Sequence, residues 1–154
     1  MPTYKLSIIG IDKDKTAVAT GRDLRVSPKH AREVARALKG KTVEAANKYL
    51  DDVMAFKRAV PFRRYNKKTS HRGNIQEGWH SGRYPVKTCK EYKKLLENLE
   101  NNAIFKNLEA DKMRLIHVMT HRARKIRGVM PRAQGRATPK INTLTHIEIV
   151  GEEF

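Results

Sequence analysis

The sequence predicts an α+β protein, because helical and strand-like patterns occupy separate parts of the chain. Three segments in the middle of the chain carry apolar residues at helical spacing, and short apolar segments typical of strands lie toward both ends. The last two strand-like segments are joined by a stretch whose Gly and Pro residues are spaced as in a long hairpin tip. At 154 residues the chain is one domain, or one domain with an appendage.

Two strands are expected before the first helix, at residues 4–9 and at residues 17–26. The helix then begins with Ser27 as its N-cap and Pro28 at its first helical position, and Gly40 stands where a left-handed residue ends it. Its expected buried residues keep helical spacing: Ala31, Val34, Ala35 and Leu38. The basic residues off that stripe are Lys29, Arg32, Arg36 and Lys39. This helix is therefore expected to bury one side and to present cations on the other.

Two more helices follow. Thr42 is the expected N-cap of the second, and Glu44 in its first turn complements the helix dipole. The expected buried side of the second helix is Val43, Ala46, Leu50 and Val53. A third helix begins near Pro85, with an apolar side formed by Val86, Cys89, Tyr92, Leu96 and Leu99.

Residues 61–85 are expected to form a long basic loop, because glycines are scattered through them and no periodic pattern is present. A structureless stretch of this length in a compact domain usually indicates function or disorder. Its aromatic residues are Phe62, Tyr65, Trp79 and Tyr84. Trp79 has two interpretations, a plug that tethers the loop to the core or a platform on which an unpaired base stacks. The same two interpretations apply to Tyr65 and His71.

The C-terminal third is expected to hold two strands, at residues 113–119 and 145–150, with Thr145, Ile147 and Ile149 on one face. Between these strands the turn-forming residues are Gly128, Pro131, Gly135 and Pro139. Their spacing predicts an extended hairpin tip rather than a packed domain.

The charge balance predicts a polyanionic partner. The chain has 33 Lys and Arg against 16 Asp and Glu, a formal net charge of +17. Nucleic acid is the first candidate and an acidic membrane surface the second. No apolar run approaches the ~20 residues of a membrane-spanning helix, and the N-terminus lacks a signal-peptide pattern. We therefore expect a cytoplasmic protein with no membrane partner.

Two windows contain no carboxylate, whereas a merely solvated face usually mixes charges of both signs. Residues 53–76 hold seven basic residues: Lys57, Arg58, Arg63, Arg64, Lys67, Lys68 and Arg72. Residues 112–147 hold nine: Lys112, Arg114, Arg122, Arg124, Lys125, Arg127, Arg132, Arg136 and Lys140. Both windows therefore favour contact with a polyanion, although charge alone does not identify which one.

The sequence predicts neither an active site nor a metal or cofactor site. His117 and His121 would share a strand face but stand too far apart for one ion, with no carboxylate near them in the sequence. The single cysteine, Cys89, excludes an internal disulfide, and its place on the apolar side of a helix favours a buried structural thiol. Asp51 and Asp52 are adjacent, so on a helix they point apart.

Residues 127–150 (RGVMPRAQGRATPKINTLTHIEIV) closely resemble the C-terminal hairpin of the universal large-subunit ribosomal protein twenty-two family, and PRAQGRA is the most specific element. Residues 24–50 (LRVSPKHAREVARALKGKTVEAANKYL) resemble the opening helices of that family. Residues 60–72 (VPFRRYNKKTSHR) and 81–103 (SGRYPVKTCKEYKKLLENLENNA) are similar to its archaeal and eukaryotic form. The resemblance covers nearly the whole chain.

This resemblance implies an α+β domain of three helices packed on a small antiparallel sheet, with a long extended β-hairpin arm. Residues 1–111 and 141–154 would form the globular domain, with a basic insertion at 61–85, and residues 112–140 the arm. It further implies a structural, non-enzymatic role in the cytoplasmic ribosome, in which the protein helps to assemble and hold several rRNA domains. The implied partners are large-subunit rRNA of the 23S type, neighbouring large-subunit proteins and the nascent polypeptide.

Site residues follow from the resemblance and the charge pattern together. The residues expected to bind rRNA are Lys29, Arg32, Arg36, Arg63, Arg64, Lys67, Lys68, His71, Arg72, Trp79, Arg122, Arg124, Lys125, Arg127, Arg132, Arg136 and Lys140. The residues expected to line the polypeptide exit tunnel are Gly128, Val129, Met130, Pro131, Arg132 and Ala133. Two other classes stay open as alternatives. A general nucleic-acid-compacting protein would need only charge, and an RNA-processing enzyme would need an acid/base or metal cluster.

Overall fold

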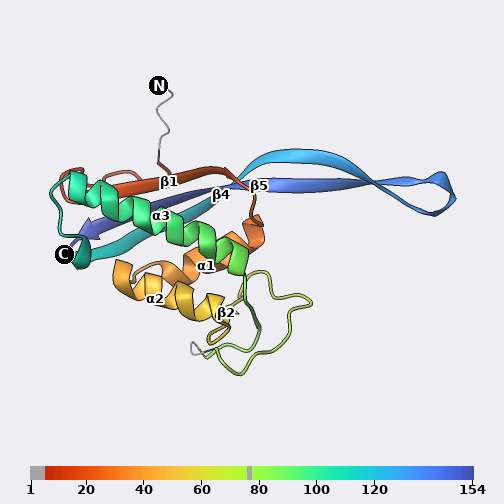
Figure 1. Cartoon of the computed structure of the whole chain (residues 1–154), viewed down its shortest axis with the longest axis horizontal. Helices are drawn as coiled ribbons and strands as arrows, with labels where there is room; N and C mark the ends of the chain where they lie inside the picture. Colours follow the sequence, from red (N-terminus) through yellow and green to blue (C-terminus); the bar gives the residue numbers. More distant parts are fainter. Residues whose placement is uncertain (1–5, 76–77) are drawn as a thin grey trace.

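The computed structural model describes residues 6–75 and 78–154, and within them three α-helices lie on one face of an antiparallel sheet (Figure 1). The helices are α1 (Pro28–Leu38), α2 (Val43–Met54) and α3 (Val86–Phe105). The sheet is formed by β1 (Thr16–Leu24), β4 (Met113–Pro131) and β5 (Ala137–Glu153), in the order β1-β5-β4. Two short strands, β2 (Val60–Pro61) and β3 (Gly82–Arg83), pair with each other beside the helices. The predicted α+β class is confirmed.

Helix α1 begins and ends where its sequence signals predict, whereas α2 begins at its predicted N-cap and ends at Met54, for which no signal was given. Ser27 and Thr42 are the N-caps, and the Thr42 hydroxyl oxygen accepts a hydrogen bond from the Ala45 N–H at 3.3 Å. Gly40 takes the left-handed conformation, with φ at +86°, and its N–H donates to the Leu115 carbonyl at 2.8 Å. This bond joins the turn between α1 and α2 to strand β4.

Helix α3 begins directly after Pro85 and packs its predicted apolar side into the core. Cys89, Tyr92, Leu96 and Leu99 are fully buried, whereas Val86 at the start of the helix is half-buried. The Tyr92 hydroxyl donates to the Ala31 carbonyl at 3.0 Å, so a buried hydrogen bond joins α3 to α1.

The expected strand at residues 17–26 is β1, but the expected strand at residues 4–9 is wrong where the structure describes it. Residues 6–9 form no strand, and Tyr4 and Lys5 lie outside the described residues. Instead the Ser7 backbone N–H and hydroxyl both donate to the carboxylate of Glu148 on β5, at 3.1 and 2.7 Å. The segment therefore lies across a face of the sheet, where it cannot pair with an edge strand.

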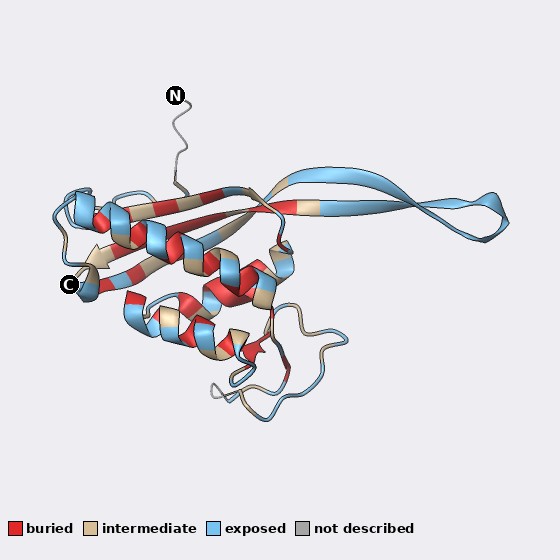
Figure 2. Ribbon diagram, viewed as in Figure 1, coloured by how far each residue is buried: buried red, intermediate tan, exposed pale blue. Residues whose placement is uncertain are grey.

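The two C-terminal strands are confirmed, but they extend far beyond residues 113–119 and 145–150. Near the helices β5 is buried on both faces, because Ile147 and Ile149 contact the core while Glu148 is buried on the opposite side. Beyond residue 121 the two strands leave the body as a two-stranded ribbon, which is exposed along nearly its whole length (Figure 2). We call the exposed ribbon of residues 122–142 the arm. Apolar alternation fades along it, so periodicity revealed only the buried halves of its strands.

Candidate nucleic-acid interface

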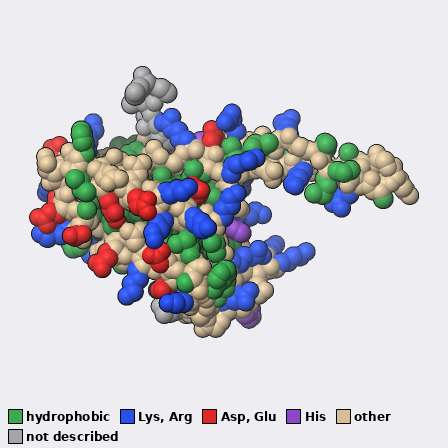
Figure 3. Space-filling view, viewed as in Figure 1, with side chains coloured by type: hydrophobic (Ala, Val, Ile, Leu, Met, Phe, Trp, Pro, Cys, Tyr) green, Lys and Arg blue, Asp and Glu red, His purple; other side chains and the backbone are tan. Residues whose placement is uncertain are grey.

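Cations lie on both faces of the arm. In the antiparallel register Lys125 is opposite Thr143 and Arg127 opposite Ile141, which places these side chains on one face. Lys140 is opposite Gly128, one residue out of step with Arg127, and therefore lies on the other face. Figure 3 shows blue Lys and Arg side chains along the arm, whereas the red acidic side chains are gathered on the body. A ribbon of this kind can be surrounded by a polyanion rather than lie flat on one.

The base of the arm carries a β-bulge between Arg122 and Lys125, where the pairing with β5 shifts by one residue. Arg124 lies in this bulge and forms an ion pair with Asp23 of β1 at 3.2 Å, although its side chain is 80% exposed. Such an exposed pair contributes little stability. Arg124 therefore stays available to an anion while it is oriented by the body.

The end of the arm is a compact turn with exposed apolar residues beside it. The Arg132 N–H donates to the Arg136 carbonyl at 2.8 Å, and Gln134 and Gly135 both have positive φ. Val129 is 74% exposed, and Met130 is also open to solvent. The remaining predicted tip residues, Gly128, Pro131 and Ala133, are exposed as well. Apolar side chains on a two-stranded ribbon have no core of their own to enter, so they are available to a partner surface.

A buried carboxylate fixes the start of the basic loop. Glu33 of α1 is 1% exposed and accepts hydrogen bonds from the backbone N–H groups of Arg63, Arg64 and Tyr65, at 3.2, 2.9 and 2.9 Å. Phe62, expected to lie among the loop aromatics, is instead buried in the core and stacks edge-on against His30. Sequence reasoning missed Glu33. The available signal was a single acid in a helix otherwise rich in cations.

Trp79 is half-buried and already engaged within the chain. Its Nε1–H donates to the Phe62 carbonyl at 3.0 Å, His80 stacks on its ring at 4.7 Å, and the Arg63 guanidinium lies 5.5 Å from the ring centroid. These contacts favour the tether over an open stacking platform. Trp79 is thereby joined to the start of the loop, where Phe62 is buried in the core.

The structure brings some predicted site residues together and leaves others apart. Arg32, Arg36 and Lys39 of α1 line a groove with Arg64 of the loop and with residues 117–120 of β4. Lys29, Arg64 and Lys67 line a neighbouring hollow. Lys68, His71 and Arg72 line neither and occupy exposed positions farther along the loop. The tip residues Arg132 and Arg136 lie at the far end of the arm, away from all of these (Figure 1).

One expectation about the histidines is corrected: a carboxylate does lie beside them. Met119 is opposite Glu148 in the sheet, so Glu148 shares a face with His117 and His121, and its oxygens lie 3.8 and 3.5 Å from their Nε2 atoms. The sequence hid this because Glu148 comes from the other strand of the pair. Burial lowers the pKa of His117. No group of three side chains suited to hold a metal ion occurs among the described residues.

Cys89 has the character of a structural thiol. Burial raises its pKa to about 12, so at neutral pH it is protonated and a poor nucleophile. In the part of the chain that the structure describes, no helix is both long and apolar enough to cross a membrane.

A small α+β body with a carboxylate-free basic arm is typical of the class of proteins that bind structured nucleic acids. Comparison with known proteins identifies the family within this class. Residues 19–152 match the family model of ribosomal protein L22p/L17e. The chain belongs to this family, as the motifs in its sequence had indicated.

Its relatives match along nearly their whole length. The large ribosomal subunit protein uL22 of Methanopyrus kandleri is 46% identical over 150 residues, which cover 97% of this chain and 94% of the relative. The uL22 protein of Thermofilum pendens is 44% identical and covers 99% of both chains. That of Methanothrix thermoacetophila is 48% identical over 87% of this chain and 88% of its own. These relatives are archaeal, in agreement with the form that the sequence resembled.

Proposed function

We propose that this chain is a structural constituent of the large ribosomal subunit in the cytoplasm, where it binds large-subunit rRNA. Membership of the L22p/L17e family supports the proposal, and the relatives are named large ribosomal subunit protein uL22. The observation that carries it is the arm, which has no carboxylate and bears cations on both faces. The role is one of assembly and support, not of catalysis.

In this proposal three basic surfaces contact different rRNA segments. The arm inserts among rRNA helices, and its Arg and Lys side chains neutralise phosphates there. The loop cations and the exposed side of α1 contact rRNA at the body. Because the arm projects away from the cations of α1 and the loop, one protein molecule would hold several rRNA domains together during assembly. Neighbouring ribosomal proteins would contact the parts of the body that lack this excess of cations.

The end of the arm would line the nascent polypeptide exit tunnel. Residues 128–133 form this part, and it combines exposed Val129 and Met130 with Arg132 beside the turn. We assign the flanking cations to rRNA and the apolar residues to the tunnel wall. The proposal keeps the division into a body of residues 1–111 and 141–154, with its insertion at 61–85, and a hairpin region of residues 112–140, in which residues 113–121 pair beside the core and the exposed remainder belongs to the arm.

Competition binding tests this function against general nucleic-acid compaction. The full chain is titrated with large-subunit rRNA in the presence of an equal nucleotide concentration of duplex DNA, at fixed salt. A structural ribosomal protein prefers the rRNA, and purified large subunits contain one copy of the chain. Equal affinity for both nucleic acids, or absence of the chain from purified subunits, would contradict the proposal.

A further inference from the structure

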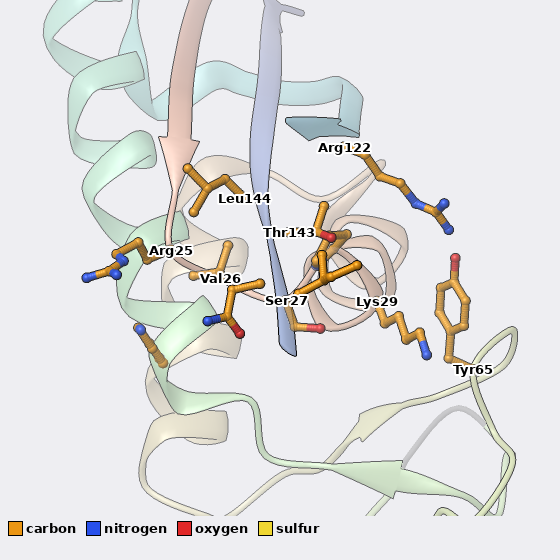
Figure 4. A pocket seen from close by; sticks show the side chains of 12 residues that line it. Arg25, Val26, Ser27, Lys29, Tyr65, Arg122, Thr143 and Leu144 are labelled. Atoms are coloured by element: carbon orange, nitrogen blue, oxygen red, sulfur yellow. The ribbon is translucent and has the colours of Figure 1, made fainter. Parts of the chain in front are cut away.

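A pocket of about 630 Å³ lies where the body, the basic loop and the base of the arm meet (Figure 4). Its lining comes from residues 25–29 at the start of α1, from Tyr65 of the loop, from Lys87 of α3, from Arg122 of β4 and from residues 141–144 of β5. Its volume lies in the range of roughly 300–1,000 Å³ that is usual for small-ligand sites. Of the residues lining it, only Lys29 and Arg122 were expected to bind rRNA.

The pocket is strongly cationic. Arg25, Lys29, Lys87 and Arg122 line it, and no carboxylate does. Among the described residues none of these four cations has an ion-pair partner. Cations gathered from separate parts of the chain without a counter-charge repel one another, so an anion in the pocket would stabilise the arrangement.

Three of the lining side chains converge on one side of β5. Figure 4 shows the Lys29 ammonium and the Tyr65 hydroxyl on the same side of the strand as Arg122, with the Tyr65 hydroxyl directed toward Arg122. Arg25 lies on the other side of the strand. The converging group therefore offers two cations and one aromatic ring to a single ligand.

Tyr65 is held in place by its backbone and by its partly buried ring, which packs against the edge of the core. Its N–H donates to Glu33 at 2.9 Å, while its half-buried ring lies 5.9 Å from the Lys29 ammonium and 5.8 Å from the Arg64 guanidinium. Cations at these distances stabilise the ring electrostatically. A fixed aromatic ring beside unpaired cations is the arrangement on which proteins stack an unpaired base.

We propose that this pocket binds one unstacked nucleotide of RNA, with its phosphate between Lys29 and Arg122 and its base against the Tyr65 ring. The inference rests on the proposed function, because it takes the RNA to be that of the large subunit. A lone phosphate would use the cations but not the ring. A nucleotide uses both.

The test measures binding of the full chain to large-subunit rRNA over a range of salt concentrations. Lys29→Gln with Arg122→Gln should lower the log–log salt slope by roughly the 0.7 that one single-strand phosphate contributes. Tyr65→Leu should weaken binding roughly tenfold or more at unchanged slope, and Tyr65→Phe should not, because the ring remains. Lys48→Gln with Lys90→Gln and Phe105→Leu are the matched controls, at exposed positions away from the pocket.

Energetic coupling between the Tyr65 ring and the pocket cations shows whether one ligand contacts both. If one nucleotide bridges them, Tyr65→Leu and Arg122→Gln together should weaken binding by less than the product of their separate effects. Ultraviolet cross-linking of wild-type protein in assembled subunits should also attach one rRNA nucleotide at Tyr65. This second readout applies even where a substituted chain folds poorly.

Three results would contradict the proposal that this pocket binds a nucleotide. They are a Tyr65→Leu affinity equal to that of the Phe105→Leu control, strictly multiplicative effects of the two substitutions, and cross-links that avoid residue 65. Failure of the proposed function is a different outcome. In that case the wild-type chain itself shows no preference for large-subunit rRNA over duplex DNA.

Discussion

The carboxylate of Glu33 accepts a hydrogen bond from the backbone N–H of Tyr65 at 2.9 Å, inside the body where Glu33 is 1% exposed. The same carboxylate also accepts the N–H groups of Arg63 and Arg64. A buried charge is costly unless hydrogen bonds compensate it, and here three backbone donors do so. Through this one side chain, helix α1 determines where the loop cations and the Tyr65 ring stand.

Glu33→Gln should destabilise the protein, because an amide has one acceptor oxygen and brings its own N–H donors toward the three backbone donors. We expect the free energy of unfolding to fall by about 1–3 kcal/mol in denaturant titration. Affinity for large-subunit rRNA should fall with it. Glu97→Gln, at an exposed position on α3, is the control and should change stability by less than about 0.5 kcal/mol. Equal effects of the two substitutions would show that the loop is held by other contacts.

Stability should decrease as the solution becomes acidic. Burial is the main cause that lowers the pKa of His30, with Arg83 and Lys29 adding to it, and burial also lowers that of His117 despite its neighbour Glu148. Since the unfolded chain then takes up protons first, the stabilisation is complete above about pH 6.5 and is lost as pH falls below it.

The measurement is the free energy of unfolding between pH 7 and pH 5. The free energy of unfolding should fall over this range, and only modestly, because both rings are only partly shielded from water. His30→Gln with His117→Gln should flatten the curve. A wild-type curve as flat as that of the double variant would show that His30 and His117 do not cause the pH dependence of stability.

The arm should be mobile in the free protein. A two-stranded ribbon that buries little apolar surface is marginally stable in water, whereas residues 113–121 and 144–153 pair beside the core. Amide hydrogen exchange should be fast at residues 125–141 and slow in β1 and the buried halves of β4 and β5. Addition of large-subunit rRNA should protect the arm. Strong protection of the free arm would mean that the ribbon is stable by itself.

Charge reversal at the end of the arm tests its phosphate contacts. Arg132→Glu with Arg136→Glu should leave the thermal unfolding of the body unchanged, since both side chains are exposed at the turn. Incorporation into large subunits should fall severalfold or more, because two cations become anions among phosphates. The control is Lys90→Glu with Lys94→Glu on α3. Normal incorporation of the arm variant would exclude these two arginines as phosphate contacts.

How much the sequence predicted depended on whether a signal was local. Both ends of helix α1 and the start of α2 were predicted, because Ser27, Pro28, Gly40 and Thr42 mark them. The arm strands were predicted only where they are buried, since an exposed ribbon has no apolar alternation. The position of the Glu148 carboxylate beside His117 depends on the register of the strands. The hydrogen bonds from the loop backbone to Glu33 depend on the path of the loop. Neither is encoded by neighbours in the sequence.

Site prediction followed the same division. The carboxylate-free windows pointed to the arm and the loop because charge composition is visible in one dimension. The pocket at the base of the arm was not visible, because Tyr65 and Arg122 are far apart in the sequence and meet only when β4 leaves the body beside the loop. Phe62 was misplaced for the opposite reason. Its basic neighbours suggested exposure, but the hydrogen bonds of the next residues to Glu33 direct it into the core.

The central claim, that the arm passes through rRNA and its end lines the exit tunnel, can be tested with one cross-linking measurement. A chain with Cys89→Ala and Val129→Cys carries a single thiol at the end of the arm, and a photoreactive group attached there is activated in ribosomes stalled with a nascent chain. The matched control carries Phe105→Cys, an 89% exposed position on α3 at the far end of the body. The account predicts cross-links to the nascent polypeptide from residue 129 and none from residue 105. Absence of cross-links from residue 129, or equal yields from both positions, would contradict it.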